Sequence, residues 1–366
     1  MNRVLISGYY GFANAGDEAM LSAIIASLKD IKSDIEIVVI SGNPEVTAKA
    51  YNIKAIPRFS FWQILKQLCK ADLLISGGGS LLQDITSERS LYYYLSIIQM
   101  AKILGKKVML YGQGIGPLQG SLAKKITALV CNQADCITVR DEGSALELKA
   151  LGLKQQQLFV TADPVFAMHA VSKDLGQRIL KKYNFKGAKP VIGISVRQWL
   201  KLENYKYVLA KVADYAVTKY DARIVFLPMH YPQDLKVSQE IADLMLHKQS
   251  ALVLEELYST EEFLSVIGNF DLLIGVRLHA LIFAAVMQVP IIGISYDPKI
   301  DRFLQGVQAT AVACLDTLSL DVLIEKVDAV LHNIEQERQI QSTCVKKLRE
   351  AAQENAQIAM DLLLRK

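Results

Sequence analysis

Short runs of apolar, often β-branched residues alternate with longer stretches of helical periodicity along the whole chain. Continuous apolar runs of this length are typical of strands that are buried on both faces, as in a parallel sheet covered by helices. The alternation therefore predicts an α/β fold with parallel sheets. At 366 residues the chain exceeds the usual size of one domain, so we expect two Rossmann-like domains that face a cleft.

The pattern also predicts where the strands and the domain boundary lie. The expected strands of the first half are residues 4–7, 35–40, 73–76, 107–111, 137–139 and 158–160. Those of the second half are residues 191–196, 223–227, 252–253, 271–274 and 290–294, with helices near 205–219, 233–248, 261–268 and 279–287. We expect domains over 1–170 and 189–340, a linker over 171–188, and a C-terminal helix over 341–366 that caps the second domain or crosses back to the first.

Composition excludes several classes of function. The chain carries 41 Lys and Arg against 37 Asp and Glu, and a net charge of +4 is too small for a nucleic-acid-binding surface. Its five cysteines include no CxxC pair, which argues against a zinc site and against a disulfide framework. We therefore predict a cytoplasmic protein without a metal and without a nucleic-acid partner. The oligomeric state stays open.

The segment after the first strand lacks a nucleotide-binding signature. It reads GYYGFANAGDE at 8–18, and its glycines do not have the GxGxxG spacing of a dinucleotide site. The chain also contains no Walker loop, no GxSxG elbow and no HExxH helix. Asp17 in this segment is a candidate base or acceptor anchor, although a carboxylate in a first helical turn also complements the helix dipole.

Two glycine-rich segments and one arginine follow other strands of the first half. The glycine-rich segments are GGGS at 77–80 and GQGIG at 112–116. Glycines allow backbone N–H groups to approach an anion closely, and we predict an anion site that includes Gly77, Gly78, Gly79, Gln113, Gly114 and Arg140. The alternative is that the glycines only permit tight turns between strands and helices.

The second half places cations and a histidine at strand ends. Arg197, Arg277, His279 and Lys299 each follow an expected strand. A guanidinium at the end of a buried strand is costly unless an anion or a carboxylate meets it. We predict that the cations bind an anion and that His279 donates a proton. The alternatives are a core carboxylate for Arg277, a structural helix cap for His279 and a solvated Lys299, while His230 is a supporting candidate at a further strand end.

Eight segments, in order, resemble the polysaccharide pyruvyl transferase family, in particular its CsaB type. They are GYYGFANAGDEAML at 8–21, GGGSLLQD at 77–84, YGQGIGP at 111–117, VRDEGS at 139–144, ADPVF at 162–166, GISVR at 193–197, GVRLHALIFAA at 275–285 and GISYDPKI at 293–300. The resemblance implies a fold like that of the GT-B glycosyltransferases. It further implies phosphoenolpyruvate as the donor and a pyruvate ketal formed on two hydroxyls of a sugar, commonly a lipid-linked saccharide or a precursor of a cell-wall polysaccharide.

The resemblance implies a role for each candidate residue. Arg140, Arg277 and Lys299, with Arg197 in reserve, would neutralise the charge of phosphoenolpyruvate. His279 would protonate its methylene carbon, and Asp17 would accept the proton of the attacking sugar hydroxyl. Phosphoenolpyruvate is then a co-substrate, and no cofactor is expected.

Other functions stay open beside this one. A nucleotide-sugar glycosyltransferase and a non-catalytic protein that binds an anionic metabolite are both compatible with the fold. The aromatic and basic residues of 57–70 also suit an anionic membrane surface, which would place the protein at the inner face of the membrane. Because Phe61, Leu65 and Leu68 have core spacing, we favour an ordinary helix packed on the first sheet.

Overall fold

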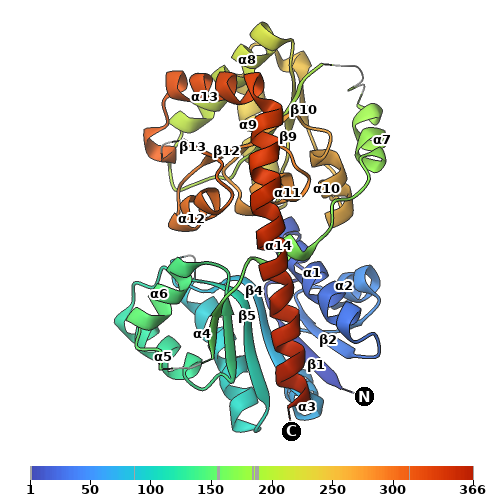
Figure 1. Ribbon diagram of the computed structural model, residues 1–366, viewed down its shortest axis with the longest axis vertical. Coiled ribbons are helices and arrows are strands. Elements are labelled where there is room, and N and C mark those ends of the chain that lie inside the picture. The colour runs from blue at the N-terminus through green and yellow to red at the C-terminus, as the bar shows by residue number, and fades with distance from the viewer. Residues whose placement is uncertain are drawn as a thin grey trace. The chain divides into compact units, whose positions relative to one another are not determined.

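The computed structural model describes residues 2–85, 87–154, 157–183, 185, 189–312 and 314–365. The chain divides into two compact units, one made of Met1–Met168 with Leu348–Lys366 and the other of His169–Lys347. Each unit contains one parallel sheet with helices on both faces (Figure 1), which confirms the predicted α/β fold class. Within the predicted linker 171–188, helix α7 (Asp174–Lys182) forms in the second unit, while residues 184 and 186–188 lie outside the described residues.

The first unit has a seven-stranded sheet. Its strands are β1 (Arg3–Ser7), β2 (Glu36–Ser41), β3 (Lys54–Pro57), β4 (Leu73–Leu82), β5 (Lys107–Ile115), β6 (Cys136–Val139) and β7 (Leu158–Val160). They lie in the order β3-β2-β1-β4-β5-β6-β7, and each neighbouring pair is parallel. The order reverses between β1 and β4, and open sheets of this kind bind ligands at the carboxyl ends of the strands beside such a reversal.

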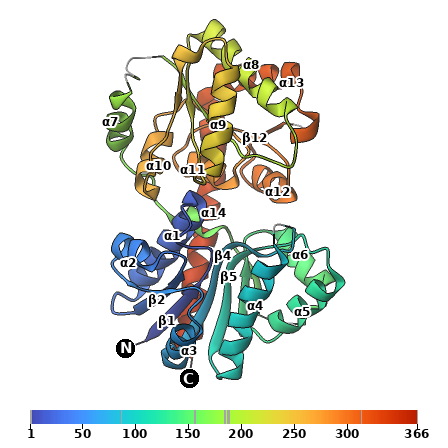
Figure 2. The same cartoon turned by 180° about the vertical axis from the view of Figure 1, so that it is seen from behind.

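Helices cover both faces of this sheet. They are α1 (Ala15–Ile31), α2 (Pro44–Tyr51), α3 (Phe61–Lys70), α4 (Glu88–Ile103), α5 (Ser121–Cys131), α6 (Glu142–Ala150) and the 3₁₀ helix η1 (Pro164–Ala167). α1 buries Leu21 and Ile24 in the hydrophobic core of one face. α3, α4 and α5 bury Leu68, Leu95 and Val130 in the core of the other face, over which α4 is visible in Figure 2.

The second unit has a six-stranded parallel sheet. Its strands, in the spatial order β10-β9-β8-β11-β12-β13, are β10 (Ala251–Val253), β9 (Arg223–Phe226), β8 (Val191–Ser195), β11 (Leu272–Gly275), β12 (Ile291–Ile294) and β13 (Thr310–Val312). Its further helices are α8 (Asn204–Tyr220), α9 (Gln233–Leu244), α10 (Thr260–Ile267), α11 (Leu278–Val286), α12 (Pro298–Gly306) and α13 (Leu320–His332), with short 3₁₀ turns η2 (Lys248–Ser250) and η3 (Leu315–Thr317). α8, α9 and α13 share one hydrophobic core, and Figure 2 shows α9 over that face of the sheet.

Helices α11 and α12 pack closely on two strands at glycines. A Cβ on Gly275 of β11 would come within 2.6 Å of the Leu281 side chain, and one on Gly293 of β12 would come within 2.4 Å of Leu304. The missing side chains therefore let the two helices approach the sheet. This close packing holds the two helices against their strands.

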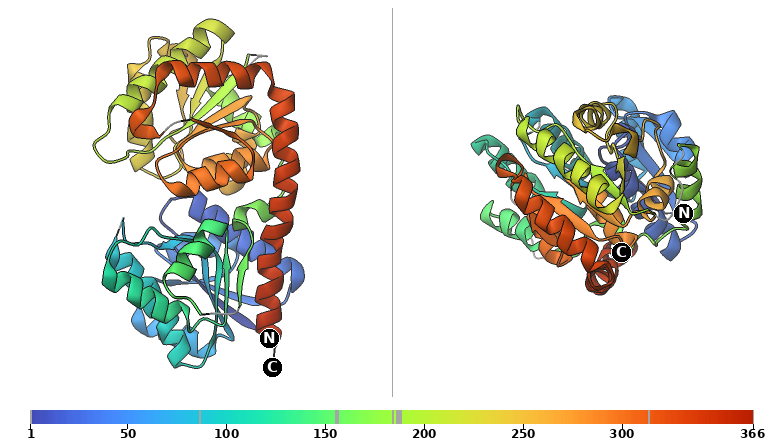
Figure 3. Two further views of the ribbon diagram at one scale, coloured as in Figure 1. Left: turned by 60° about the vertical axis from the view of Figure 1, so that its left-hand side comes forward. Right: turned by 90° about the horizontal axis from the view of Figure 1, so that it is seen from above.

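The last helix, α14 (Ile334–Leu364), is continuous over 31 residues and begins earlier than the predicted 341 (Figure 3). Its C-terminal part belongs to the first unit. There Asn355 is fully buried, and its Oδ1 accepts hydrogen bonds from the hydroxyls of Thr138 at 2.5 Å and Thr161 at 2.8 Å. Its Nδ2 donates to the carbonyl of Ala162 at 3.2 Å. These bonds attach the end of the chain to β6 and to the residues that follow β7.

The sequence pattern misses β3 and β13. β3 is an edge strand that exposes Lys54 and ends at Pro57, so it contains no continuous apolar run. Proline and lysine are common on edge strands, where they hinder further pairing. β13 is only three residues long and is likewise an edge strand, at one end of the second sheet. Both misses concern edges, where burial leaves the weakest trace in the sequence.

Candidate functional site

The glycine segment after β1 is held by the first turn of α1. Asn14 caps the helix, because its side chain accepts a hydrogen bond from the N–H of Gly16 at 3.1 Å. Glu18 accepts from the N–H of Gly11 at 2.7 Å and from the Tyr51 hydroxyl at 3.1 Å. Burial raises the pKa of Glu18, and these hydrogen bonds oppose the rise. Glu18 therefore has a structural role, which is to fix the segment that carries Asp17.

Asp17 lies beside Gly79 of β4, and its charge acts on three tyrosines. Its Oδ1 is 3.5 Å from the position that a Cβ on Gly79 would occupy, and Gly79 has a φ of +79°, which favours glycine. Burial, followed by the charge of Asp17, raises the pKa of Tyr10 well above its ordinary value. The same charge acts in the same direction on Tyr9 and Tyr94. The charge of Asp17 thus helps to keep the hydroxyls of Tyr9, Tyr10 and Tyr94 protonated.

The first glycine run lies within β4 and not in a loop after the strand, which corrects its predicted place, while its role in binding an anion stays a prediction. β4 continues through Gly77 and Gly79, which pair with Tyr111 and Gln113 of β5. Glycines paired in a sheet present fewer free N–H groups to a ligand than glycines in a loop. They instead make room for neighbours, since a Cβ on Gly77 would come within 2.6 Å of the Tyr10 hydroxyl oxygen.

Buried polar atoms without partners lie at the carboxyl end of β1 and inside the neighbouring strands β4 and β5. Gln113 is fully buried, and its Nε2 donates to the carbonyl of Ser76 at 3.1 Å. Within the described parts of the chain, the Oε1 of Gln113 and the hydroxyls of Ser7 and Ser76 have no hydrogen-bond partner. Such atoms are uncommon in folded proteins and often indicate a bound water or ligand. The role of Gln113 in binding the donor stays a prediction.

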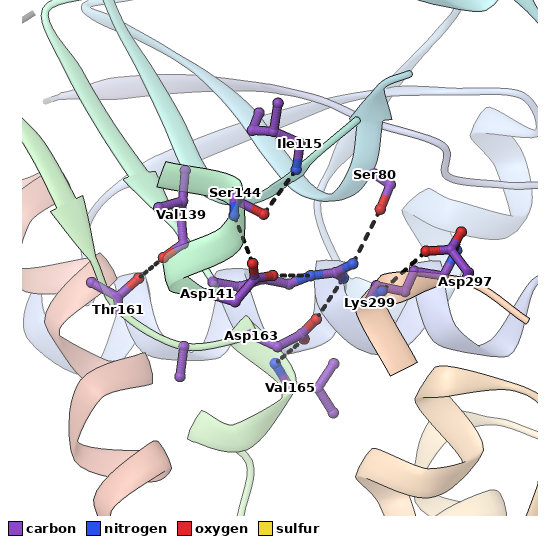
Figure 4. Close-up of polar contacts among 12 residues, drawn as sticks. Ser80, Ile115, Val139, Asp141, Ser144, Thr161, Asp163, Val165, Asp297 and Lys299 are labelled. Carbon is purple, nitrogen blue, oxygen red and sulfur yellow. Dashed lines mark hydrogen bonds and ion pairs between the residues drawn. The ribbon is translucent and has the colours of Figure 1, made fainter. Parts of the chain in front are cut away.

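Arg140 is surrounded by hydrogen-bond acceptors of its own unit. Its Nη1 donates to Asp163 at 3.1 Å and its Nη2 to the hydroxyl of Ser80 at 3.1 Å, while its Nε lies 3.7 Å from the Asp141 carboxylate. In Figure 4 the side chains of Ser80, Asp141 and Asp163 point toward a common centre. A Cβ on Gly114 would come within 2.6 Å of Nη2, so Arg140 needs a glycine there. Two carboxylates already offset its charge, and a donor-binding role for Arg140 and Gly114 stays a prediction.

In the second unit, Arg277 is held by Asp234. The guanidinium donates from Nε to Asp234 Oδ2 at 2.8 Å and from Nη2 to Oδ1. Asp234 is fully buried and also accepts from the backbone N–H groups of Met229 at 3.2 Å and His230 at 2.9 Å. The alternative of a core carboxylate for Arg277 is therefore realised. The bidentate pair fixes the guanidinium at the carboxyl end of β11.

Tyr296 brings three predicted cations together. The Nη1 of Arg197 donates to the Tyr296 hydroxyl at 2.8 Å, and the guanidinium carbon lies 5.0 Å from the ring centroid. The Nζ of Lys299 lies 5.4 Å from the same centroid. Burial alone would raise the pKa of Tyr296, but the charges of Lys299, Arg197 and Arg277 bring it below its ordinary value. Arg197 and Lys299 thus lie against one ring at the carboxyl ends of β8 and β12, and the charge of Arg277, which follows β11, acts on the same hydroxyl.

These three cations differ in their carboxylate partners. Lys299 lies 3.2 Å from the carboxylate of Asp297, and Arg277 is paired as described above. Arg197 has no carboxylate partner among the described residues, and its Nε has no hydrogen-bond partner there. The family resemblance gives Arg197 only a secondary role in binding the donor. Arg197 is nevertheless the cation of this group whose charge no carboxylate of the described residues offsets.

Two histidines lie at the same edge of the second sheet. His279 is the second residue of α11 and is half-buried. The positive end of a helix dipole favours a bound anion at this position. His230 follows β9, and burial, followed by the charge of Arg277, lowers its pKa, so its ring is neutral at neutral pH. The proton-donor role of His279 stays a prediction.

Sequence reasoning did not single out Asp234 or Tyr296. Asp234 stands in a first helical turn, where an acidic residue is already explained by the helix dipole. Tyr296 stands inside the segment GISYDPKI, where only Lys299 attracted attention. The available signal was position, because both residues follow buried strands whose carboxyl ends carry the predicted cations.

Two observations bear on metals and membranes. The described residues contain no group of three or more His, Cys, Asp or Glu side chains that is placed to hold a metal ion. In the part of the chain that the structure describes, no helix has the length and apolar character of a membrane-spanning segment.

Helix α3 packs on the first sheet through Ile64 and Leu68, as the sequence predicts. Phe61, which is predicted to lie in the core, is instead 52% exposed, and its neighbours Phe59 and Trp62 are 83% and 76% exposed.

Solved structures of similar fold confirm the two-domain architecture. The MnaA–UDP co-structure from S. aureus matches with a TM-score of 0.71 and 13% identity over all of this chain and 99% of that one. UDP-GlcNAc 2-epimerase from Neisseria meningitidis, bound to UDP-GlcNAc, matches with a TM-score of 0.67 and 13% identity over the full length of both chains. Anabaena HepE in complex with UDP-glucose matches with a TM-score of 0.67 and 10% identity over 99% of both chains. At such low identity these likenesses show the fold alone, which is the GT-B type with two Rossmann-like domains.

The sequence itself matches a relative and a family model. The amylovoran biosynthesis protein AmsJ of Erwinia amylovora is 22% identical over 91% of this chain and 93% of its own length. The model described as polysaccharide pyruvyl transferase matches residues 14–298, which is well over half of the chain and includes both Asp17 and His279. Because this match covers most of the chain, the protein belongs to the polysaccharide pyruvyl transferase family and is a transferase enzyme.

Proposed function

We propose that this enzyme transfers the pyruvyl group of phosphoenolpyruvate to two hydroxyls of a saccharide, forms a ketal and releases phosphate. The observation that carries the proposal is the group of Arg197, Arg277 and Lys299 around Tyr296. Fixed cations at the ends of buried strands are suited to a small, highly charged anion. The family match supports the chemistry assigned to that anion.

The charge of the donor favours the second unit as its site. A phosphate ester that also carries a carboxylate has a charge of about −2.5 to −3 at neutral pH. Three cations against the two carboxylates of Asp234 and Asp297 leave one positive charge in excess within this group. The amino termini of α11 and α12 add partial positive charge at the same strand ends. A protonated His279 would add a further charge when the donor is bound.

The proposed chemistry needs a proton donor and a proton acceptor. His279 protonates the methylene carbon of the donor, which leaves C2 as an oxocarbenium-like electrophile. A hydroxyl of the acceptor attacks C2 while Asp17 accepts its proton, and the bond between C2 and the phosphate oxygen breaks. A second hydroxyl then attacks C2 and closes the ketal, and its proton leaves with the released phosphate.

The acceptor is proposed to bind the first unit, close to Asp17. Hydroxyls of Tyr9 and Tyr94 lie in the neighbourhood of this carboxylate, and they suit a sugar that needs both donors and acceptors of hydrogen bonds. By analogy with the family we propose a lipid-linked saccharide or a precursor of a cell-wall polysaccharide. A lipid-linked acceptor would also explain the exposed aromatic residues at the start of α3.

Titration calorimetry tests the donor. We expect binding of phosphoenolpyruvate but not of UDP-glucose, and an affinity that is about 10- to 100-fold weaker in Arg197→Gln, as expected for the loss of charge-assisted hydrogen bonds. Arg178→Gln, at an exposed position of α7, is the matched control and should bind normally. Tighter binding of UDP-glucose would favour a glycosyltransferase, and an unchanged affinity in Arg197→Gln would remove Arg197 from the donor site.

A further inference from the structure

Arg58 is a buried arginine in the first unit that none of the assigned roles uses. It follows the edge strand β3 and precedes α3, and its backbone N–H donates to the carbonyl of Ser41 at 2.9 Å. Only 9% of its surface is exposed. Burying a guanidinium to this extent removes most of its hydration, which is costly without a compensating anion.

Aromatic rings, and not carboxylates, surround this guanidinium. Its central carbon lies 4.4 Å from the ring centroid of Tyr93, 5.0 Å from that of Phe59, 5.1 Å from that of Phe12 and 5.8 Å from that of Tyr94. The Tyr93 hydroxyl also donates to the backbone carbonyl of Arg58 at 2.8 Å. Stacked rings hold a guanidinium plane in one orientation while leaving its charge in place.

The charge of Arg58 is not paired within the part of the chain that the structure describes. No carboxylate there forms an ion pair with it, and its Nε has no hydrogen-bond partner. Cation–π contacts stabilise a guanidinium, but they leave the N–H at the Nε edge of Arg58 without an acceptor. An anion with two oxygens is the group that matches such an edge.

The surroundings of Arg58 connect it to the proposed acceptor region. Phe12 belongs to the glycine segment that precedes Asp17, and its ring stacks on that of Tyr9 with centroids 4.4 Å apart. The hydroxyl of Tyr94 is buried without a partner in the described residues. Both Arg58 and Asp17 influence the pKa of Tyr9 and of Tyr94, in opposite directions. The two charged groups therefore act on the same small region.

We propose that Arg58, held by the rings of Phe12 and Tyr93, is a subsite for an anionic group, a carboxylate or a phosphate, on the saccharide acceptor. The inference rests on the proposed function in one respect, namely that a saccharide is the acceptor. The stacked Tyr9 and Phe12 rings beside the guanidinium give apolar faces on which a sugar ring packs. An acidic or phosphorylated sugar would then be anchored by its charge while its hydroxyls lie near Asp17.

Binding without the donor tests this subsite. The probes are glucuronate and glucose 6-phosphate, each compared with glucose by titration of the whole protein. We expect the wild type to bind at least one of the two acids about 10- to 100-fold more tightly than glucose, as expected for charge-assisted hydrogen bonds. Preference for glucuronate alone or for glucose 6-phosphate alone identifies which anionic group the subsite takes.

Arg58→Gln should abolish that preference, and Arg58→Lys should keep part of it because the charge remains. Arg89→Gln, at an exposed position of α4, is the matched control and should bind like the wild type. A folded Arg58→Gln protein with the full preference would overturn the proposal. If that variant does not fold, the wild type decides, because glucose bound as tightly as both acids would overturn the subsite equally.

The outcome is separable from that of the proposed function. A protein that prefers the acids but transfers no pyruvyl group keeps the subsite and loses the proposed reaction. A protein that transfers pyruvyl groups without preferring the acids loses only the subsite. The protein could instead bind anionic lipid vesicles and not the soluble acids. If Arg58→Gln lost that vesicle binding, the anion would belong to a membrane, which would contradict the saccharide subsite.

Discussion

The guanidinium of Arg277 is bound through Nε and Nη2 by the fully buried carboxylate of Asp234. This pair gives Arg277 a structural function in addition to the proposed contact with the donor. It also explains why the arginine is oriented before any ligand binds. A preorganised cation loses little freedom on binding, which favours affinity.

Arg277→Ala should therefore have two separate effects. It leaves the Asp234 carboxylate buried without its cation, so the free energy of unfolding should fall by about 3–5 kcal/mol. It should also weaken the binding of phosphoenolpyruvate. Adding Asp234→Asn should restore part of the stability, measured by denaturant unfolding, but not the affinity. If the double variant recovered normal donor binding, Arg277 would be only structural.

His279→Ala should lower turnover by a factor of about 10² to 10⁴, the usual size of a general acid–base contribution. Phosphate release in the presence of phosphoenolpyruvate and an acceptor measures this effect. The affinity for the donor should change much less than the turnover, since the ring acts mainly in the transition state. A purified variant with normal turnover would show that the proton comes from another group.

The lowered pKa of His230 predicts a pH dependence of stability. Between that pKa and the ordinary value of 6.5, the unfolded chain binds a proton that the folded protein does not. The free energy of unfolding should therefore decrease as the pH falls through this window. His230→Gln should lose less stability over the same interval, while His169→Gln, at an exposed position, should behave like the wild type. Equal pH dependence in all three proteins would contradict the burial argument.

The exposed aromatic residues near α3 predict a membrane contact if the acceptor is lipid-linked. The combined replacement of Phe59 and Trp62 by alanine should weaken the binding to vesicles that contain anionic lipid, measured by sedimentation. Leu122→Ala with Leu129→Ala, two exposed apolar residues of α5, is a control of equal number. If the Phe59 and Trp62 variant bound vesicles as well as the wild type does, this surface would not be the membrane contact.

The buried strands and the strand-end cations were predictable from sequence, because burial on both faces leaves long apolar runs that stop abruptly. The length of β4 was not, since glycines in a strand and glycines in a turn look alike without their partners. Gly77 and Gly79 could be assigned only once their pairing with Tyr111 and Gln113 was visible. The prediction of a loop failed at that point.

The partners of the cations were also hidden in the sequence. Arg277 and Asp234 are distant in the chain, and the carboxylate already had a local explanation at the start of α9. Arg58 was noticed only as part of a basic and aromatic segment, because its burial depends on rings from α4 and from the segment after β1. Long-range contacts of this kind decide which arginine is neutralised and which is available to an anion.

Mass spectrometry of a lipid-linked saccharide incubated with the enzyme and phosphoenolpyruvate is the direct test of pyruvyl transfer. We expect a product that carries the mass of one pyruvate ketal, with one phosphate released for each product molecule, and both changes slowed by a factor of about 10² to 10⁴ with His279→Ala. An acceptor that gains a hexose from UDP-glucose, or that is never modified while phosphoenolpyruvate stays intact, would contradict it.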